Sequence, residues 1–240
     1  MKKRPKVKDQ MRQRSLAIDE RSLFEKLCDQ VNLIAGFKAV KKNGGSPGVD
    51  GVTVEDFSNC LDEELAQLKT DLESWSYKPV PVRRVEIPKP GKGAGVRLLG
   101  VPCVRDRVVQ ATLKLLLEPI LDLTFSDHSY GFRPGFNQQQ AVESAQRIVE
   151  SGKEYVVDID LSKFFDRVNH DRLIHLLSFH IADKRIHRLI GMTLRSGVMV
   201  NGVMEPTTEG TVQGSPLSPL LSNVILDELD KELELRGLEF

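Results

Sequence analysis

Three carboxylates interrupt an apolar run in the middle of the chain, "VVDIDLSKFFD" at residues 156–166. Asp158 and Asp160 alternate with apolar residues, and this pattern predicts a buried β-strand over Tyr155–Leu161 with both carboxylates on one side. Ionised carboxylates are costly to bury unless they are paired or bind a metal. The two could present hard oxygen ligands to Mg²⁺. They could also pair with arginines, and the strand by itself slightly favours that second interpretation.

Two other stretches carry groups that suit phosphate binding. Lys89 and Arg97 flank the glycine-rich loop of a predicted β-hairpin. They could close together over a triphosphate, lysine as a point charge and arginine as a planar fork, although an ordinary basic hairpin fits equally well. "VQGSPLSPLLSN" places glycine and small hydroxyls at a predicted helix start, where a backbone can approach nucleic acid closely. An ordinary capped helix is the somewhat stronger interpretation of that stretch alone.

The composition is that of a soluble globular protein. The chain has 240 residues, 34 basic and 34 acidic, with 40% hydrophobic and 28% charged residues. It has no apolar run of the roughly 18 residues that span a bilayer, and the start lacks the apolar stretch of a signal peptide. Its three cysteines are far apart and form no CxxC pair. These features predict a cytoplasmic protein in a reducing compartment, with no membrane partner.

Although the net charge is zero, basic and acidic residues are concentrated in different segments of the chain. Residues 1–14 contain seven basic residues, Lys2, Lys3 and Arg4 among them, and residues 78–107 contain eight. Residues 205–240 reverse the balance, with eight acidic residues against two basic ones. Basic arms and patches bind phosphates, although a solvated surface with a disordered start explains the charges as well.

Periodicity and turn residues predict a mixture of helices and strands without strict alternation, which favours an α+β fold. An edge strand over residues 77–88 and a returning strand over 96–102 form the first hairpin, and "VMVNGVM" forms a second around Asn-Gly. Helices are predicted over residues 20–42, 53–75 with Thr53 as N-cap, 103–118 ending before Pro119, 138–151, about 170–180, from Asp183 to Gly197, and from Ser215 onward.

Six segments together resemble the reverse transcriptases encoded by bacterial group II introns. They are "GSPGVDGVT", "IPKPGKGAGVRLLGVP", "DRVVQ", "SYGFRPG", "DLSKFFDRVNHDRL" and "QGSPLSPLLSN", in the order of that family, and they cover about residues 40–235. The likeness extends to related bacterial reverse transcriptases. It implies a right-hand polymerase with a basic arm at 1–20, fingers at 21–150 and the N-terminal part of the palm at 151–240, built as an antiparallel palm sheet with packed helices.

The resemblance also implies a reaction: addition of dNTP to a primer 3′ end by two Mg²⁺ ions. Asp160 would be the catalytic metal ligand, with the Leu161 backbone carbonyl in the same metal shell. Phe165 matches the aromatic gate that selects dNTP over rNTP, whereas the neighbouring Phe164 suits a core position. The dNTP would also contact Lys89, Arg97, Gln213 and Gly214.

The implied partners are an RNA template, a DNA primer, dNTP and group II intron RNA, and a homodimer is left open. Arg133, Lys2, Lys3 and Arg4 are weaker candidates for contacts with template or other RNA.

One motif of the family is missing. The second carboxylate motif, aromatic-Ala-Asp-Asp, does not occur, and the sequence contains no Asp-Asp pair. We therefore expect a truncated chain or fragment with an incomplete two-metal site, which does not polymerise alone and exposes an unpaired strand edge. The main alternative is a non-catalytic, maturase-type fragment that binds intron RNA and assists splicing. A third is a repurposed domain of a retron, a diversity-generating element or a CRISPR-linked reverse transcriptase.

Overall fold

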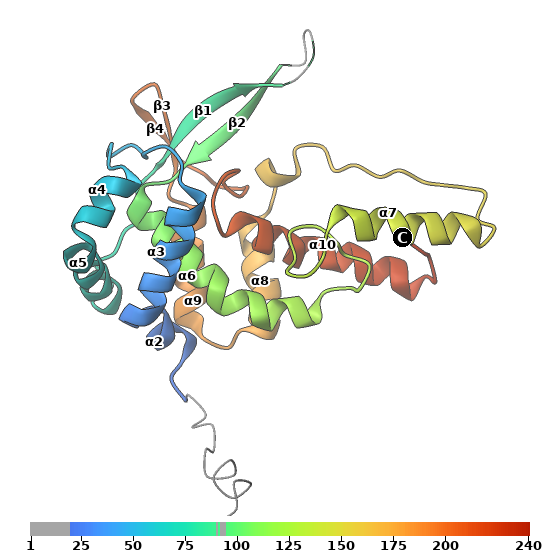
Figure 1. Cartoon of the computed structure of the whole chain (residues 1–240), viewed down its shortest axis with the longest axis horizontal. Helices are drawn as coiled ribbons and strands as arrows, with labels where there is room; N and C mark the ends of the chain where they lie inside the picture. The colour runs from blue at the N-terminus through green and yellow to red at the C-terminus, as the bar shows by residue number, and fades with distance from the viewer. Residues whose placement is uncertain (1–19, 90, 92–94) are drawn as a thin grey trace, which may run out of the picture.

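Helices α3 (Gln30–Asn43) and α6 (Val104–Leu121) pack against each other at the centre of the fold (Figure 1). The computed structural model describes residues 20–89, 91 and 95–240. Leu113 and Leu117 of α6 are completely buried. α6 continues through Pro119, so the predicted end before this proline is wrong. A proline in the last turn removes only one backbone hydrogen bond, which the helix tolerates.

Each of the two helices predicted near the N-terminus divides in two. α2 (Leu23–Leu27) stops before α3 because Asp29 caps the new helix, its carboxylate accepting from the Val31 N–H at 2.9 Å. α4 (Val54–Asn59) and α5 (Leu61–Glu73) are separated at Cys60. The predicted cap at Thr53 is confirmed, since Thr53 and Asp56 form a capping box.

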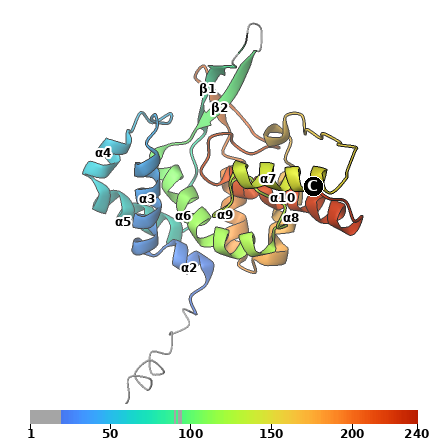
Figure 2. The same ribbon diagram turned by 45° about the vertical axis from the view of Figure 1, so that its right-hand side comes forward.

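A four-stranded sheet stands at one end of the helices, in the order β2-β1-β3-β4 (Figures 1 and 2). Both predicted hairpins are confirmed, and Asn201 and Gly202 adopt the positive φ of the Asn-Gly turn. β1 and β3 are parallel and pair only through Val82 and Arg83 of β1. The sheet is therefore mixed rather than antiparallel, and β1 is an edge strand only beyond Arg83. The strands are β1 (Val82–Pro88), β2 (Val96–Val101), β3 (Val198–Val200) and β4 (Val203–Glu205).

Of the remaining helices, α10 (Ser218–Leu235) packs against α6 and against α8 (His170–His180), and α8 packs against α9 (Lys184–Leu194). α7 (Gln138–Glu150) has no buried residue. The predicted cap at Asp183 is confirmed, and Asn169 and Asn137 cap their helices in the same way. None of the described helices is long and apolar enough to cross a membrane. The short 3₁₀ helices are η1 (Asp122–Thr124) and η2 (Phe164–Asp166).

The predicted buried strand over Tyr155–Leu161 is wrong. The segment runs as an unpaired trace between α7 and η2 (Figure 1). Tyr155 is 92% exposed and Val157 81% exposed. An apolar alternating sequence prefers an extended backbone, but a strand also needs a neighbour for its N–H and C=O groups. In the part of the chain that the structure describes, no strand lies beside this segment.

Candidate functional site

The first hairpin presents two cations from one face. Lys89 directly follows β1, and its N–H donates to the Gly95 carbonyl at 3.0 Å. Arg97 lies on β2 opposite Ile87. In this antiparallel register Lys89 and Arg97 are diagonal neighbours on the same face of the hairpin. Both are exposed, and neither forms an ion pair with the described residues, so both are available to a phosphate group.

The loop at residues 213–214 is docked on this hairpin. The Gly100 N–H of β2 donates to the Gln213 carbonyl at 2.8 Å. Gly214 has a φ of +110°, and a Cβ atom there would lie 2.6 Å from the Gly100 carbonyl oxygen. The contact therefore requires glycine at position 214, because a side chain would push the loop away from β2. The two sequence-predicted residues of this loop are fixed relative to the hairpin that carries Lys89 and Arg97.

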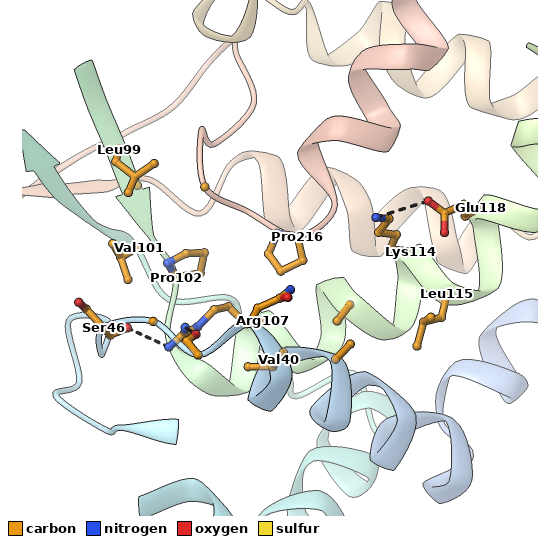
Figure 3. Close-up of a pocket in the computed structure, with 17 residues that line it drawn as sticks. Val40, Ser46, Leu99, Val101, Pro102, Arg107, Lys114, Leu115, Glu118 and Pro216 are labelled. Carbon is orange, nitrogen blue, oxygen red and sulfur yellow. Dashed lines mark hydrogen bonds and ion pairs between the residues drawn. The ribbon is translucent and has the colours of Figure 1, made fainter. Parts of the chain in front are cut away.

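A cavity of about 520 Å³ borders both this loop and the end of β2 (Figure 3). Its walls come from α3, from α6, from the end of β2 and from the chain around Gly214. Apolar groups such as Val101 and Pro216 alternate with glycines, and Lys114 lies at one end. Lys114 is paired with Glu118 at 3.4 Å, so its charge is already balanced.

Arg107 is the unbalanced charge in the cavity wall. Its guanidinium donates to the Gly44 carbonyl at 3.1 Å and to the Ser46 carbonyl at 3.0 Å, and Nε has no partner (Figure 3). The residue is only 7% exposed, and burial lowers its pKa. A buried cation without a carboxylate is costly, so this wall suits an anion. Sequence reasoning did not select Arg107, although it lies in the quoted segment "DRVVQ".

Phe165 connects the carboxylate segment to the docked loop. Its carbonyl accepts from the Thr211 N–H at 2.6 Å, and its half-buried ring lies 5.7 Å from the ring of Phe164. Phe164 packs against the hydrophobic core, as the sequence predicts. The predicted gate residue is thus held close to Gln213 through residues 211–213.

Asp160 lies on the unpaired segment, and its side chain is exposed. The Leu161 carbonyl accepts from the Phe164 N–H at 3.2 Å. Carboxylate and carbonyl oxygens are the ligands that Mg²⁺ prefers, so both groups fit that ion chemically. Within residues 20–89, 91 and 95–240, however, no three His, Cys, Asp or Glu side chains come together. Asp160 therefore offers one ligand rather than a complete metal site.

Arg133 is placed differently from the template contact expected for it. It is 8% exposed, and its guanidinium donates to the Asp122 carboxylate at 2.8 Å and the Ser129 carbonyl at 2.9 Å. It also stacks on Phe136, 4.2 Å from the ring centroid. Its donors are used within its own loop, which argues against a template contact. Lys2, Lys3 and Arg4 lie outside the described residues.

The family described as reverse transcriptase (RNA-dependent DNA polymerase) matches residues 87–239. The chain belongs to this family. Protein YkfC of Escherichia coli (strain K12) is 37% identical over 201 residues, which are 82% of this chain and 52% of YkfC. The group II intron-encoded protein LtrA of Lactococcus lactis is 34% identical over 190 residues, 79% of this chain and 31% of LtrA. The chain is therefore similar to a protein that is named for its group II intron.

A solved structure has the same fold. A chain of a Cas6-RT-Cas1–Cas2 complex aligns with a TM-score of 0.61 and 25% identity over 90% of this chain and 22% of that chain. It agrees with the expected α+β arrangement of fingers and palm. The chain spans about half the length of YkfC and about a third of LtrA.

Proposed function

We propose that the chain forms the fingers and the first part of the palm of an RNA-directed DNA polymerase, which adds dNTPs to a primer 3′ end on an RNA template. The contact between Gly100 and the Gln213–Gly214 loop carries the proposal. It joins the hairpin that presents Lys89 and Arg97 to the loop that borders the Arg107 cavity. A triphosphate and a template strand would thus both bind next to this loop. Membership of the reverse transcriptase family supports the same reaction.

Each group then has a distinct task. Lys89 and Arg97 bind the triphosphate, and Arg97 adds the planar geometry of a guanidinium. The Phe165 ring lies under the sugar and disfavours a 2′-hydroxyl. Arg107 binds a template phosphate in its cavity. Asp160 and the Leu161 carbonyl would hold Mg²⁺, which would supply stabilisation of the charge that develops at the transferred phosphate.

The test is dTTP incorporation on poly(rA)·oligo(dT) with Mg²⁺ by a polymerase that contains this chain as its fingers and first part of the palm. If the proposal is right, Asp160→Asn lowers incorporation by about 100-fold or more, the size expected for a group that stabilises transition-state charge. Lys89→Ala and Arg97→Ala each raise the KM for dTTP about tenfold, because each removes a phosphate contact. Arg236→Ala, an exposed arginine at the end of α10, is the matched control and leaves both values unchanged.

A second candidate is a maturase-type role, binding intron RNA without nucleotidyl transfer. The exposed, unpaired position of Asp160 and the single ligand it offers favour this role. It predicts salt-dependent binding of structured RNA with no incorporation above that of Asp160→Asn. A chain that neither binds RNA nor incorporates dTTP would overturn both candidates.

A further inference from the structure

A second groove lies between α8 and α9, away from the hairpin that carries Lys89 and Arg97. The hairpin is at the top of Figures 1 and 2, whereas α8 and α9 are among the lower helices in both views. The two helices are packed side by side, and the groove between them has a volume of about 410 Å³. The residues that line it include Asp171, His175, Ser178, His187, Arg188 and Arg195.

Two arginines of α9 supply the positive charge. Arg188 and Arg195 are about two helical turns apart and so share one face. Neither forms an ion pair with the described residues. The Arg188 guanidinium lies over the Trp75 ring at 4.4 Å from its centroid, which restricts its position. Gly191 lies between them, and a Cβ there would be 2.7 Å from Nη2 of Arg195. The absent side chain leaves Arg195 room to lie across the helix.

The opposite wall is polar and only weakly acidic. Asp171 is the one carboxylate among the residues that line this groove, against two guanidinium groups. On the α9 wall itself, Nε2 of His187 is enclosed and has no hydrogen-bond partner among the described residues. Such a nitrogen is normally satisfied by a water or a ligand oxygen. The groove therefore suits an anion better than a cation.

An exposed aromatic side chain touches a residue of the groove from the neighbouring cavity between α8 and α10. Phe179 of α8 is 67% exposed, and its ring contacts that of His175 edge-on, with centroids 4.8 Å apart. One exposed phenylalanine needs no explanation by itself. Its contact with His175, which lines the groove, nevertheless connects it to the two arginines that have no carboxylate partner among the described residues. Phosphate-binding cations near a platform for base stacking are the combination that binds single-stranded nucleic acid.

We propose that the α8–α9 groove binds a single-stranded stretch of RNA. Arg188 and Arg195 contact neighbouring phosphates, and a base stacks on Phe179. An acidic peptide would also pair with the arginines, but it would leave Phe179 without a role. The choice of RNA rests on the proposed function, whereas the groove itself does not. Because the groove lies on different elements from the nucleotide site, it would bind RNA whether or not Asp160 supports polymerisation.

The test measures binding of fluorescein-labelled dodecauridylate to the purified chain by fluorescence anisotropy. Arg195→Gln and Phe179→Ala each weaken binding about five- to tenfold, the range for one phosphate contact or one stacked base. Arg195→Gln also lowers the slope of log affinity against log salt concentration by about one, the value for one lost phosphate contact, whereas Phe179→Ala leaves this slope unchanged. Arg236→Gln is the control of equal charge and has no effect. Melting temperatures confirm that each variant is folded.

The binding position is mapped with the same RNA containing 4-thiouridine, which forms photo-crosslinks. Crosslinked peptides from α8 or α9 that Asp160→Asn leaves unchanged support the groove. The proposal is overturned if Arg195→Gln and Phe179→Ala bind the RNA as tightly as Arg236→Gln does. It is also overturned if the crosslinks are confined to the hairpin and the Arg107 cavity. An abasic oligomer that binds as tightly as the RNA would exclude stacking. Displacement of the crosslinks by polyglutamate at equal charge concentration would assign the groove to an acidic peptide.

Discussion

Helix α6 and the segment Tyr155–Leu161 are both rich in valine and leucine, yet one is buried and the other is exposed. Leu113 of α6 has no solvent-exposed surface, whereas Val157 is 81% exposed. The difference lies in the backbone. A helix satisfies its own N–H and C=O groups and can pack through side chains alone, whereas an extended segment needs a second chain segment beside it. An apolar pattern therefore predicts burial more safely for a helix than for a strand.

The largest expected difference between the two regions comes from a pair of substitutions that shorten one apolar side chain in each. Leu113→Ala should lower the free energy of unfolding by about 4 kcal/mol, because it leaves a cavity between α6 and its neighbours. Val157→Ala should change it by less than about 0.5 kcal/mol, because no packing is lost. Urea denaturation measures both. Equal losses would mean that the exposed segment is packed in solution.

The loop at residues 213–214 allows a second comparison, between two glycine-to-alanine substitutions. Gly214 and Gly152 both have positive φ, +110° and +99°, but only Gly214 lies against another backbone. Gly152→Ala should cost about 1 kcal/mol of stability for the backbone conformation alone. Gly214→Ala should cost about 3 kcal/mol, because its Cβ also collides with the Gly100 carbonyl. Similar losses in the same urea titration would show that the 213–214 loop is not fixed to β2.

A third test compares a buried tyrosine hydroxyl that bonds to α6 with an exposed one in the segment Tyr155–Leu161. The Tyr77 hydroxyl donates to the buried Asp106 carboxylate at 2.6 Å, whereas Tyr155 is 92% exposed. Tyr77→Phe should cost about 2 kcal/mol near pH 8, because it removes a hydrogen bond from a buried charge. Tyr155→Phe should cost nothing measurable.

The loss in Tyr77→Phe should also depend on pH. Burial raises the pKa of Asp106, and the bond from Tyr77 opposes that rise. A carboxyl whose pKa is higher in the folded state retains its proton longer there, so its contribution to stability falls as pH rises through that pKa. Without Tyr77 the pKa rises further, and the loss should be larger at pH 8 than at pH 5. Thermal melts at the two pH values measure it, and a loss that is the same at both would contradict this account.

Local signals account for what could be predicted from the sequence. The caps at Thr53 and Asp183 and the Asn201–Gly202 turn depend on neighbouring residues, and all three are confirmed. The state of Tyr155–Leu161 depends on a partner strand, which no local pattern reveals.

In the candidate site, too, the sequence predicts which residues matter but not the contacts that depend on the tertiary structure. Motif resemblance selects Lys89, Arg97 and the Gln213–Gly214 loop, but not their connection through Gly100, which requires the folded sheet. The uncompensated burial of Arg107 depends on the distant loop of Gly44 and Ser46. Resemblance therefore identifies residues, while tertiary structure decides their electrostatics.

Because β1 and β3 pair over only two residues, the first hairpin is held at its base while its tip projects from the sheet. It is anchored at Val82 and Arg83, where β3 pairs with β1 and the Arg83 guanidinium donates to the Pro47 carbonyl at 2.9 Å. Beyond this anchor β1 continues through Arg84–Pro88 paired only with β2, about 3.3 Å per residue. A rotation of a few degrees at the anchor is thus magnified at Lys89. Stiffness at the base, and not at the tip, therefore governs how far the two cations can move.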